Sequence, residues 1–211
     1  MNPADRIVYL VRHGEVLNPE HLVYADLPGF PLSQNGRRQA EDTADRLPLN
    51  ATIVSSPLDR AIETAEIIAA ARNGPVIVDE ALTEWGLGRR WAGHAWDDLD
   101  ADFPGELDAY LTHPGCLPFS PESLAELAAR VGDAVVRHRS QIAGPLILVS
   151  HQDPIQAARL HLTGRPLADL ATWKPQHAGV VELDPGTALP WVERAMWEPD
   201  QHPGVPPRSS M

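Results

Sequence analysis

The chain has 211 residues, of which 43% are hydrophobic, which is enough to bury one substantial core. Its 17 basic and 29 acidic residues give a formal net charge of −12, which argues against a nucleic-acid or anionic-membrane partner. No apolar run approaches the ~20 residues of a membrane span, and the first residues lack the order of a signal peptide. The single cysteine, Cys116, cannot form an internal disulfide. We therefore expect a cytoplasmic protein.

Apolar runs and helix signals alternate along the first part of the chain. The run at residues 7–11 is short, β-branched and nearly continuous, which is typical of a strand buried on both faces. Ser33 and Ser56 each stand where a hydroxyl would cap the next helix, and Pro57 would occupy the first turn of the second helix. The predicted elements are a strand at 7–11, a helix at 33–47, a strand at 51–54, a helix at 57–72 and a strand at 76–78.

Between residues 82 and 121 the pattern breaks into short helical stretches rich in Gly, Pro, Trp and Asp. We expect this excursion to cover one edge of the sheet, with a lid at about 84–122 that walls a pocket. The elements predicted after it are a helix at 123–142, a strand at 145–149, a helix at 154–162 and strands at 179–183 and 191–196. Residues 198–211 are rich in Pro, Gly and Ser and are expected to form a disordered tail.

This order of elements predicts an α/β fold, a three-layer sandwich with a mainly parallel central sheet, helices on both faces and a small lid insertion. No internal repeat or linker divides the chain, so residues 1–197 are expected to form a single domain. In such folds ligands bind at the carboxyl ends of the strands. Polar residues just beyond the predicted strands are therefore the first candidates for a functional site.

Two arginines and two histidines occupy such positions. Arg12 and His13 follow the first strand directly, and Gly14 after them lets the backbone approach a ligand closely. Arg60 lies in the first turn of a helix that follows a strand, and His151 comes just after another strand. Alone, each of these is an ordinary loop, solvated or structural residue. Together they would converge on one mouth of the sheet and form the local cationic cluster that an anion site on an acidic protein requires.

Acidic and aromatic residues near this mouth allow two interpretations each. Glu84 would be a solvated glutamate, unless Trp85 or Trp91 desolvates it and raises its pKa toward that of a general acid. Trp91 and Trp96 could equally wall a substrate site or pack the lid. Asp153 could select against highly anionic substrates or cap the next helix, and the cap is favoured.

The remaining histidines lack metal-ligand spacing with paired carboxylates, so we expect no metal and no organic cofactor. Among them, His94 and His177 could line the pocket, although a structural or solvated role is favoured for each. The set comprises His21, His94, His113, His138, His161, His177 and His202.

Five motifs in chain order resemble those of the histidine phosphatase superfamily, which has the phosphoglycerate-mutase-like fold, over nearly the whole chain. They are Arg12-His13-Gly14-Glu15 with Asn18; Pro31-Leu32-Ser33 with Gly36 and Gln39-Ala40; Ser56-Pro57-Leu58 with Arg60-Ala61 and Thr64-Ala65; Glu84 with Gly88 and Gly93; and Val149-Ser150-His151. The resemblance implies that His13 is the phosphorylated nucleophile and that Glu84 is the proton donor. It also implies a phosphate pocket formed by Arg12, Arg60 and His151 and lined by Asn18.

The resulting hypothesis is a phosphomonoester hydrolase that acts through a phosphohistidine on His13, with a small phosphorylated metabolite as substrate. Neutral His13 would attack phosphorus while the two arginines and a protonated His151 hold the phosphoryl oxygens. A phosphoglycerate mutase is one alternative, disfavoured because the segment at Glu84 reads Glu-Trp-Gly-Leu rather than the Glu-Arg-His-Tyr type. A non-catalytic phospho-ligand binding protein is another. Substrate identity and oligomeric state stay open.

Overall fold

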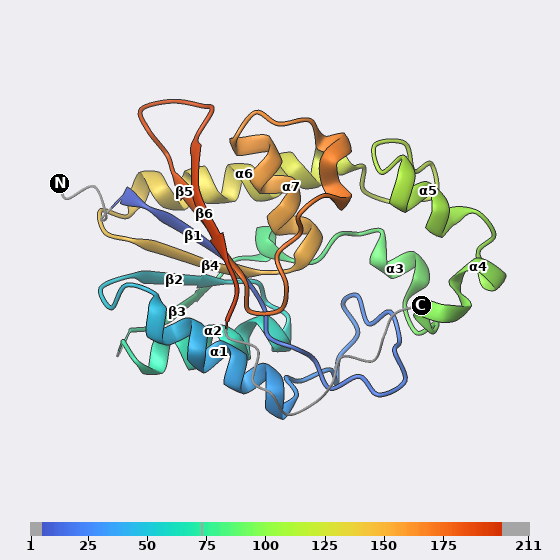
Figure 1. Cartoon of the computed structure of the whole chain (residues 1–211), viewed down its shortest axis with the longest axis horizontal. Coiled ribbons are helices and arrows are strands. Elements are labelled where there is room, and N and C mark those ends of the chain that lie inside the picture. Colours follow the sequence, from blue (N-terminus) through green and yellow to red (C-terminus); the bar gives the residue numbers. More distant parts are fainter. Residues whose placement is uncertain (1–5, 73, 200–211) are drawn as a thin grey trace.

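A computed structural model describes residues 6–72 and 74–199, and within them the chain is built on one mixed sheet of six strands (Figure 1). Four strands are parallel to one another, β5 runs antiparallel to β1, and β6 runs antiparallel to β5. The predicted mainly parallel sheet is thus confirmed, with an antiparallel pair at one side. In spatial order the strands are β3 (Val76–Val78), β2 (Thr52–Ser55), β4 (Leu146–Ser150), β1 (Val8–Arg12), β5 (Val180–Asp184) and β6 (Val192–Trp197).

Helices cover both faces of this sheet. On one face α1 packs beside α2, and on the other α6 packs beside α7 (Figure 1). The bounds of these helices are α1 (Gln34–Arg46), α2 (Asp59–Ala70), α6 (Leu124–Gln141) and α7 (Gln152–Leu162), and a short helix η4 (Leu167–Ala171) follows α7. The three-layer α/β sandwich predicted from the order of elements is therefore confirmed.

The central strand β4 shows why the sheet is buried on both sides. Its side chains alternate between faces, so that Leu146 and Leu148 join the apolar cluster beneath α6 and α7, whereas Ile147 and Val149 join the cluster beneath α1 and α2. All four side chains are buried. A strand apolar at every position is what such double coverage requires, and it explains the continuous apolar run in the sequence.

The segment between β3 and α6, called the insertion below, holds only short helices and lies apart from the sandwich at one end of the molecule (Figure 1). Its aromatic side chains pack against one another: the ring centroid of Trp91 lies 5.8 Å from that of Tyr110 and 6.4 Å from that of Trp96. The helices of the insertion are η2 (Glu80–Leu82), α3 (Gly88–Trp91), η3 (Trp96–Asp98), α4 (Leu99–Asp102) and α5 (Glu106–Thr112). The predicted break in regular structure is confirmed.

One of the two predicted helix caps is correct. The Ser33 hydroxyl accepts a hydrogen bond from the amide of Gly36 and caps α1. The prediction for Ser56 is wrong, because α2 begins at Asp59 after Leu58, which makes no side-chain capping bond. The hydroxyl of Ser56 instead lies 2.8 Å from Nε2 of His151, so the residue serves the site rather than the helix.

Most of the expected tail, residues 200–211, lies outside the described residues. Within the described ranges, none of the helices combines the length and the apolar composition needed to cross a membrane.

The turn after β1 is packed directly against the start of α1, and this packing generates a prediction. A Cβ atom added at Gly36 would lie 2.0 Å from the carbonyl oxygen of Glu15, a backbone atom that cannot move away on its own. We expect Gly36→Ala to lower the free energy of unfolding by about 2–3 kcal/mol, measured by denaturant unfolding. Gly115→Ala is the matched control, since nothing lies within 4 Å of its Cβ position. Equal stability of the two variants would contradict the packing described.

Candidate active site

The ends of two neighbouring parallel strands bring two histidines together. Arg12 is the last residue of β1 and Ser150 the last residue of β4, so His13 and His151 both emerge at the same edge of the sheet. The amide of His13 donates a hydrogen bond to the carbonyl of Ser150 at 3.0 Å, which fixes this register. The two rings lie 5.2 Å apart, and the residues are 2% and 0% exposed.

The surroundings of His13 select one tautomer of its ring. Nδ1 lies 2.8 Å from the carbonyl oxygen of Gly14, which can only accept, so we assign the proton to Nδ1 and leave Nε2 unprotonated. Nε of Arg60 donates toward Nε2 at 3.3 Å. Burial, followed by the charge of Arg60, lowers the pKa of His13 well below its usual range. The ring is therefore neutral at physiological pH, as predicted, with Nε2 available as a nucleophile.

Arg60 and Arg12 flank this nitrogen. Arg60 is buried at the start of α2; its Nη2 donates to the carbonyl of Ala25 at 2.7 Å, and its guanidinium lies 4.6 Å from the ring centroid of Tyr24. The guanidinium of Arg12 donates through Nη1 to the carbonyl of Pro175 and contacts Nε2 of His177 at 2.9 Å. Both cations are thus held in place before any ligand arrives.

Two buried nitrogens of the site have no hydrogen-bond partner: Nε of Arg12 and Nδ1 of His151. Each such group costs about 1–3 kcal/mol in a protein interior unless an acceptor satisfies it. On His151, Nε2 lies 2.8 Å from the hydroxyl of Ser56, and we assign that hydroxyl as the donor and the ring proton to Nδ1. The two unpartnered donors, with Arg60 beside them, form a site for a multiply charged oxyanion.

The protein groups around His151 oppose the protonated form expected of it, and its protonation with a phosphoryl group bound stays a prediction. Burial, followed by the charges of Arg60 and Arg12, lowers the pKa of His151 well below its usual range. A neutral ring with its proton on Nδ1 can still donate a hydrogen bond to a phosphoryl oxygen. The function expected of His151 therefore needs no imidazolium.

Glu84 lies two residues after the end of η2 and lines a cavity together with His13. Its Oε1 accepts a hydrogen bond from the amide of Trp85 at 2.8 Å, and its Oε2 lies 3.8 Å from Nδ1 of His151. Burial raises the pKa of Glu84 to about 7, with a further upward contribution from Asp153. The predicted desolvation of this carboxyl is confirmed, and a pKa of about 7 suits a group that both gives and takes protons at neutral pH.

A charged clamp from α6 holds the segment that carries Glu84. The guanidinium of Arg130 donates to the carbonyls of Ala81 and Thr83 at 3.0 and 3.1 Å and pairs with Glu122 at 2.7 Å. Glu122 in turn accepts a hydrogen bond from the amide of Gly86 at 3.0 Å. The backbone on both sides of Glu84 is thus tied to one ion pair, although the sequence offered no sign of it.

A cavity of about 290 Å³ opens onto His13 and Arg12 and extends beneath the insertion. Trp91 and Trp96 both line it, and Trp91 is at the same time packed in the core, so a substrate against these two rings stays a prediction. The lining residues are Arg12, His13, Leu22, Val23, Tyr24, Ala25, Glu84, Trp85, Leu87, Gly88, Trp91, Trp96, Tyr110, Gln152 and Asp153. A pocket of this size accommodates a small phosphorylated molecule.

Asp153 does not cap α7, contrary to the favoured expectation. Its Oδ1 lies 2.6 Å from Nζ of Lys174, and its Oδ2 accepts a hydrogen bond from the hydroxyl of Tyr110 at 2.9 Å. The side chain therefore faces the insertion and the segment before β5, and α7 begins without a side-chain cap.

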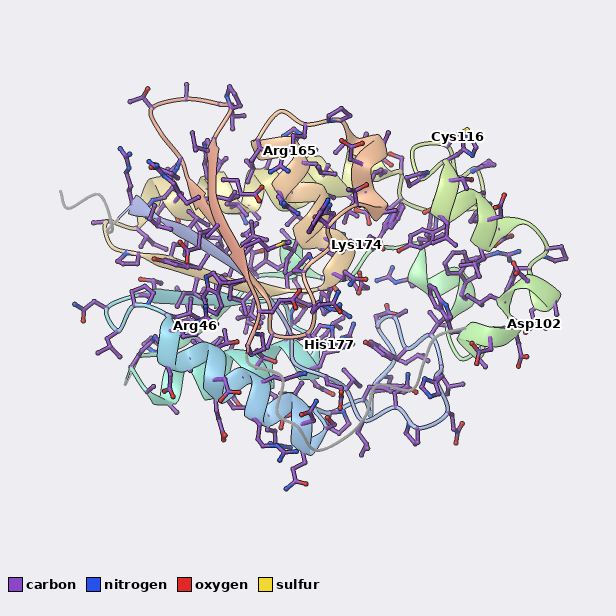
Figure 2. All side chains as sticks on the ribbon, viewed as in Figure 1. Arg46, Asp102, Cys116, Arg165, Lys174 and His177 are labelled. Carbon is purple, nitrogen blue, oxygen red and sulfur yellow. The ribbon has the colours of Figure 1, made fainter. Side chains whose placement is uncertain are left out.

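Lys174 and Tyr24 escaped the sequence analysis, which named His177 only as a residue that could line the pocket. Lys174 and His177 lie on the connection between η4 and β5 (Figure 2), and Tyr24 precedes Ala25 in the loop after β1. The favoured solvated or structural role of His177 is incomplete, since burial and Arg12 lower its pKa to about 3 and it accepts from Arg12 as a neutral ring. Only the antiparallel pairing of β5 with β1 brings this segment to the site.

Two other candidates lie differently. The amide side chain of Asn18 bonds both the carbonyl and the amide of Leu22, a residue of the cavity wall, so its direct contact with phosphate stays a prediction. His94 pairs with Asp102 on the exposed surface of the insertion, 2.7 Å apart. Over residues 6–72 and 74–199, no group of three or more His, Cys, Asp or Glu side chains is arranged to hold a metal ion.

Comparison with known proteins agrees with this geometry. The profile of the histidine phosphatase superfamily (branch 1) matches residues 8–197. The chain belongs to this superfamily. A glucosyl-3-phosphoglycerate phosphatase of Mycobacterium tuberculosis (strain ATCC 25618 / H37Rv) is 34% identical over 183 residues, 79% of this chain and 78% of the relative. A solved mycobacterial glucosyl-3-phosphoglycerate phosphatase superimposes with a TM-score of 0.78 at 28% identity, covering 92% of this chain and 99% of that one.

Another relative carries a different name. A 2,3-bisphosphoglycerate-dependent phosphoglycerate mutase of Thermoplasma acidophilum (strain ATCC 25905 / DSM 1728 / JCM 9062 / NBRC 15155 / AMRC-C165) is 31% identical over 156 residues, 72% of this chain and 74% of the relative. Membership of this superfamily, together with relatives that are phosphatases, identifies the protein as an enzyme, a histidine phosphatase.

The environment of Glu84 predicts a pH dependence. As an acid with a pKa of about 7, it loses the proton needed by a leaving alcohol as pH rises through that value. We therefore expect kcat/KM for an alkyl phosphate to fall above about pH 7, and Glu84→Gln to remove this limb and lower the rate about 10²–10⁴-fold. A steady-state pH profile of both proteins checks this. A wild-type profile that stays flat between pH 6 and 9 would contradict the role given to Glu84.

Proposed function

We propose that this protein is a phosphomonoester hydrolase that works through a phosphohistidine on His13 and acts on a small phosphorylated metabolite. The observation that carries the proposal is the unprotonated Nε2 of His13, which lies between Arg60 and a second histidine in a site that also offers unpartnered donors. An acid–base group, Glu84, completes the set on the open side. Phosphatase names among the relatives agree with it.

In the first step, Nε2 of His13 attacks phosphorus in line, and the bond from phosphorus to the alcohol oxygen breaks. Arg12, Arg60 and the Nδ1–H group of His151 bind the phosphoryl oxygens as charge redistributes over them. Glu84, in its protonated form, delivers its proton to the departing alcohol oxygen. The alcohol leaves, and the phosphoryl group stays on His13.

In the second step, water replaces the alcohol. The Glu84 carboxylate accepts a proton from this water as its oxygen attacks phosphorus, and the phosphorus–nitrogen bond breaks. Inorganic phosphate leaves, and Glu84 is again protonated. The two directions of proton transfer explain why a pKa of about 7 is useful here, since both forms of Glu84 are populated near neutral pH.

Two further aspects belong to the proposal. We propose that residues 1–197 act as one domain with the insertion as its lid, supported by the span of the family profile, residues 8–197. A cytoplasmic location remains a prediction of the sequence.

Phosphoglycerate mutase activity is the alternative, because one relative bears that name. We favour hydrolysis because the segment at the acid reads Glu84-Trp85-Gly86-Leu87 and is not of the Glu-Arg-His-Tyr type expected of such mutases. A non-catalytic phosphate-binding protein is disfavoured because nucleophile and acid are both present in one pocket.

A panel of phosphorylated metabolites, assayed for release of inorganic phosphate, tests the proposal. We expect hydrolysis of several esters by the wild type and a loss of at least about 10³-fold for His13→Ala. His94→Ala is the matched control, since His94 pairs with Asp102 away from the cavity lining, and it should retain activity. Activity that survives His13→Ala would contradict the proposal. Isomerisation of phosphoglycerates without net phosphate release would identify a mutase instead.

A further inference from the structure

The cavity has two chemically different ends. One end holds Arg12 and His13, where the phosphoryl group binds; the other lies against the insertion and must receive the leaving group. We infer that this second end selects phosphomonoesters whose leaving group is either apolar and uncharged, or cationic. Esters whose leaving group carries a carboxylate are excluded. The inference rests on the proposed hydrolase function and adds the class of substrate.

The wall of the second end is largely aromatic. Trp85, Trp91, Trp96 and Tyr110 line it, and the Trp91 ring stands at 87° and 88° to the rings of Tyr110 and Trp96. Trp96 keeps 43% of its surface exposed, whereas Trp85 and Trp91 are buried. An apolar group that covers the exposed part of Trp96 removes it from water, which favours binding by about 25 cal/mol per Å². The wall therefore fits a hydrocarbon or aromatic body.

The charges around the second end are unfavourable to an anion. Among the described lining residues, Arg12 is the one lysine or arginine, and it belongs to the phosphate end. Glu84 and Asp153 contribute carboxyl groups to the lining. A substrate carboxylate would thus find no partner at this end, since Asp153 already holds Lys174 and Glu84 carries the proton for the leaving group. An unpaired charge is costly in a buried site.

Cations close to the lining are already engaged. Arg89 pairs with Asp26 at 2.6 Å, and Arg90 pairs with Glu106 at 3.0 Å. The charge of each guanidinium is therefore already opposed by a carboxylate of the protein.

Lys174 is held even more firmly. Its ammonium lies 2.6 Å from Asp153, donates to the hydroxyl of Tyr110 at 2.7 Å, and stands 4.9 Å from the centre of that ring. Asp153 lines the cavity, whereas Lys174 approaches it from the segment before β5. The Asp153 carboxylate is therefore the member of the ion pair that lines the cavity, and its remaining lone pairs can accept from a hydroxyl or ammonium group of the substrate. Its counter-ion, the Lys174 ammonium, also donates to the hydroxyl of Tyr110.

Matched substrate pairs test the inference on the wild-type protein. Phosphoethanolamine is phosphoserine without its carboxylate, and glycerol 3-phosphate is 3-phosphoglycerate with the carboxylate reduced to an alcohol. We expect kcat/KM to be at least about tenfold higher for the member without the carboxylate in each pair, because a desolvated, unpaired charge is costly. 2-Phenylethyl phosphate should likewise exceed ethyl phosphate, and Trp96→Ala should reduce that advantage.

Two variants should move the carboxylate preference in opposite directions. The ratio to measure is kcat/KM for the member without the carboxylate divided by kcat/KM for the carboxylated member. Asp153→Asn releases Lys174 and should lower this ratio several-fold. Lys174→Met leaves Asp153 unneutralised and should raise it. Asp153 also affects the pKa of Glu84, but this effect is the same for both substrates at one pH and cancels in the ratio. Asp133→Asn, on the exposed face of α6, is the control and should leave the ratio unchanged. Circular dichroism identifies any variant that fails to fold.

The outcomes separate this inference from the function on which it rests. Hydrolysis of p-nitrophenyl phosphate together with an equal or greater kcat/KM for the carboxylated esters would overturn the inference and leave the hydrolase intact. Ratios that shift in the same direction in Asp153→Asn and Lys174→Met would also overturn it. Absence of hydrolysis for every phosphoester would overturn the hydrolase assignment and the inference with it.

Discussion

The hydrogen bond from the amide of His13 to the carbonyl of Ser150 ties together the ends of β1 and β4, and the site depends on it. Because the two strands are parallel neighbours, this bond places His13 and His151 side by side. After each histidine, the chain continues into segments that line the cavity. A second contact comes from Thr64, whose hydroxyl accepts a hydrogen bond from the amide of Gly14. This bond links the turn after β1 to α2, which carries Arg60. Nucleophile and cations are thereby positioned by backbone rather than by flexible side chains.

Burial shifts the pKa of the two histidines and that of Glu84 in opposite directions. It lowers the pKa of His13 and His151, which keeps one ring nucleophilic and the other a neutral donor, and it raises the pKa of Glu84 to about 7. The same low-polarity environment leaves Nε of Arg12 and Nδ1 of His151 without acceptors. The phosphoester binding that we propose is therefore compatible with a net charge of −12, because the attraction is local and scarcely screened.

Much of this architecture was predictable from sequence. The continuous apolar runs gave the positions of β1 and β4, and the polar residues just after them gave His13 and His151. What could not be predicted depends on contacts between distant segments. The β5 strand runs antiparallel beside β1, and this brings His177 to Arg12, although nothing local marks that histidine. The clamp of Arg130 on the backbone around Glu84, and the use of Asp153 by Lys174 and Tyr110 rather than by its own helix, likewise arise only from tertiary packing.

The central claim is that Nε2 of His13 takes the phosphoryl group. Rapid mixing with an aryl phosphate whose leaving group departs easily, followed by an alkaline quench, would preserve a phosphohistidine for peptide mass spectrometry and phosphorus NMR. The account predicts one phosphoryl group on His13, in the Nε2 isomer, because Nδ1 is bound to the carbonyl of Gly14. A protein that turns over the substrate with no phosphohistidine, or with the phosphoryl group on another residue, would contradict it.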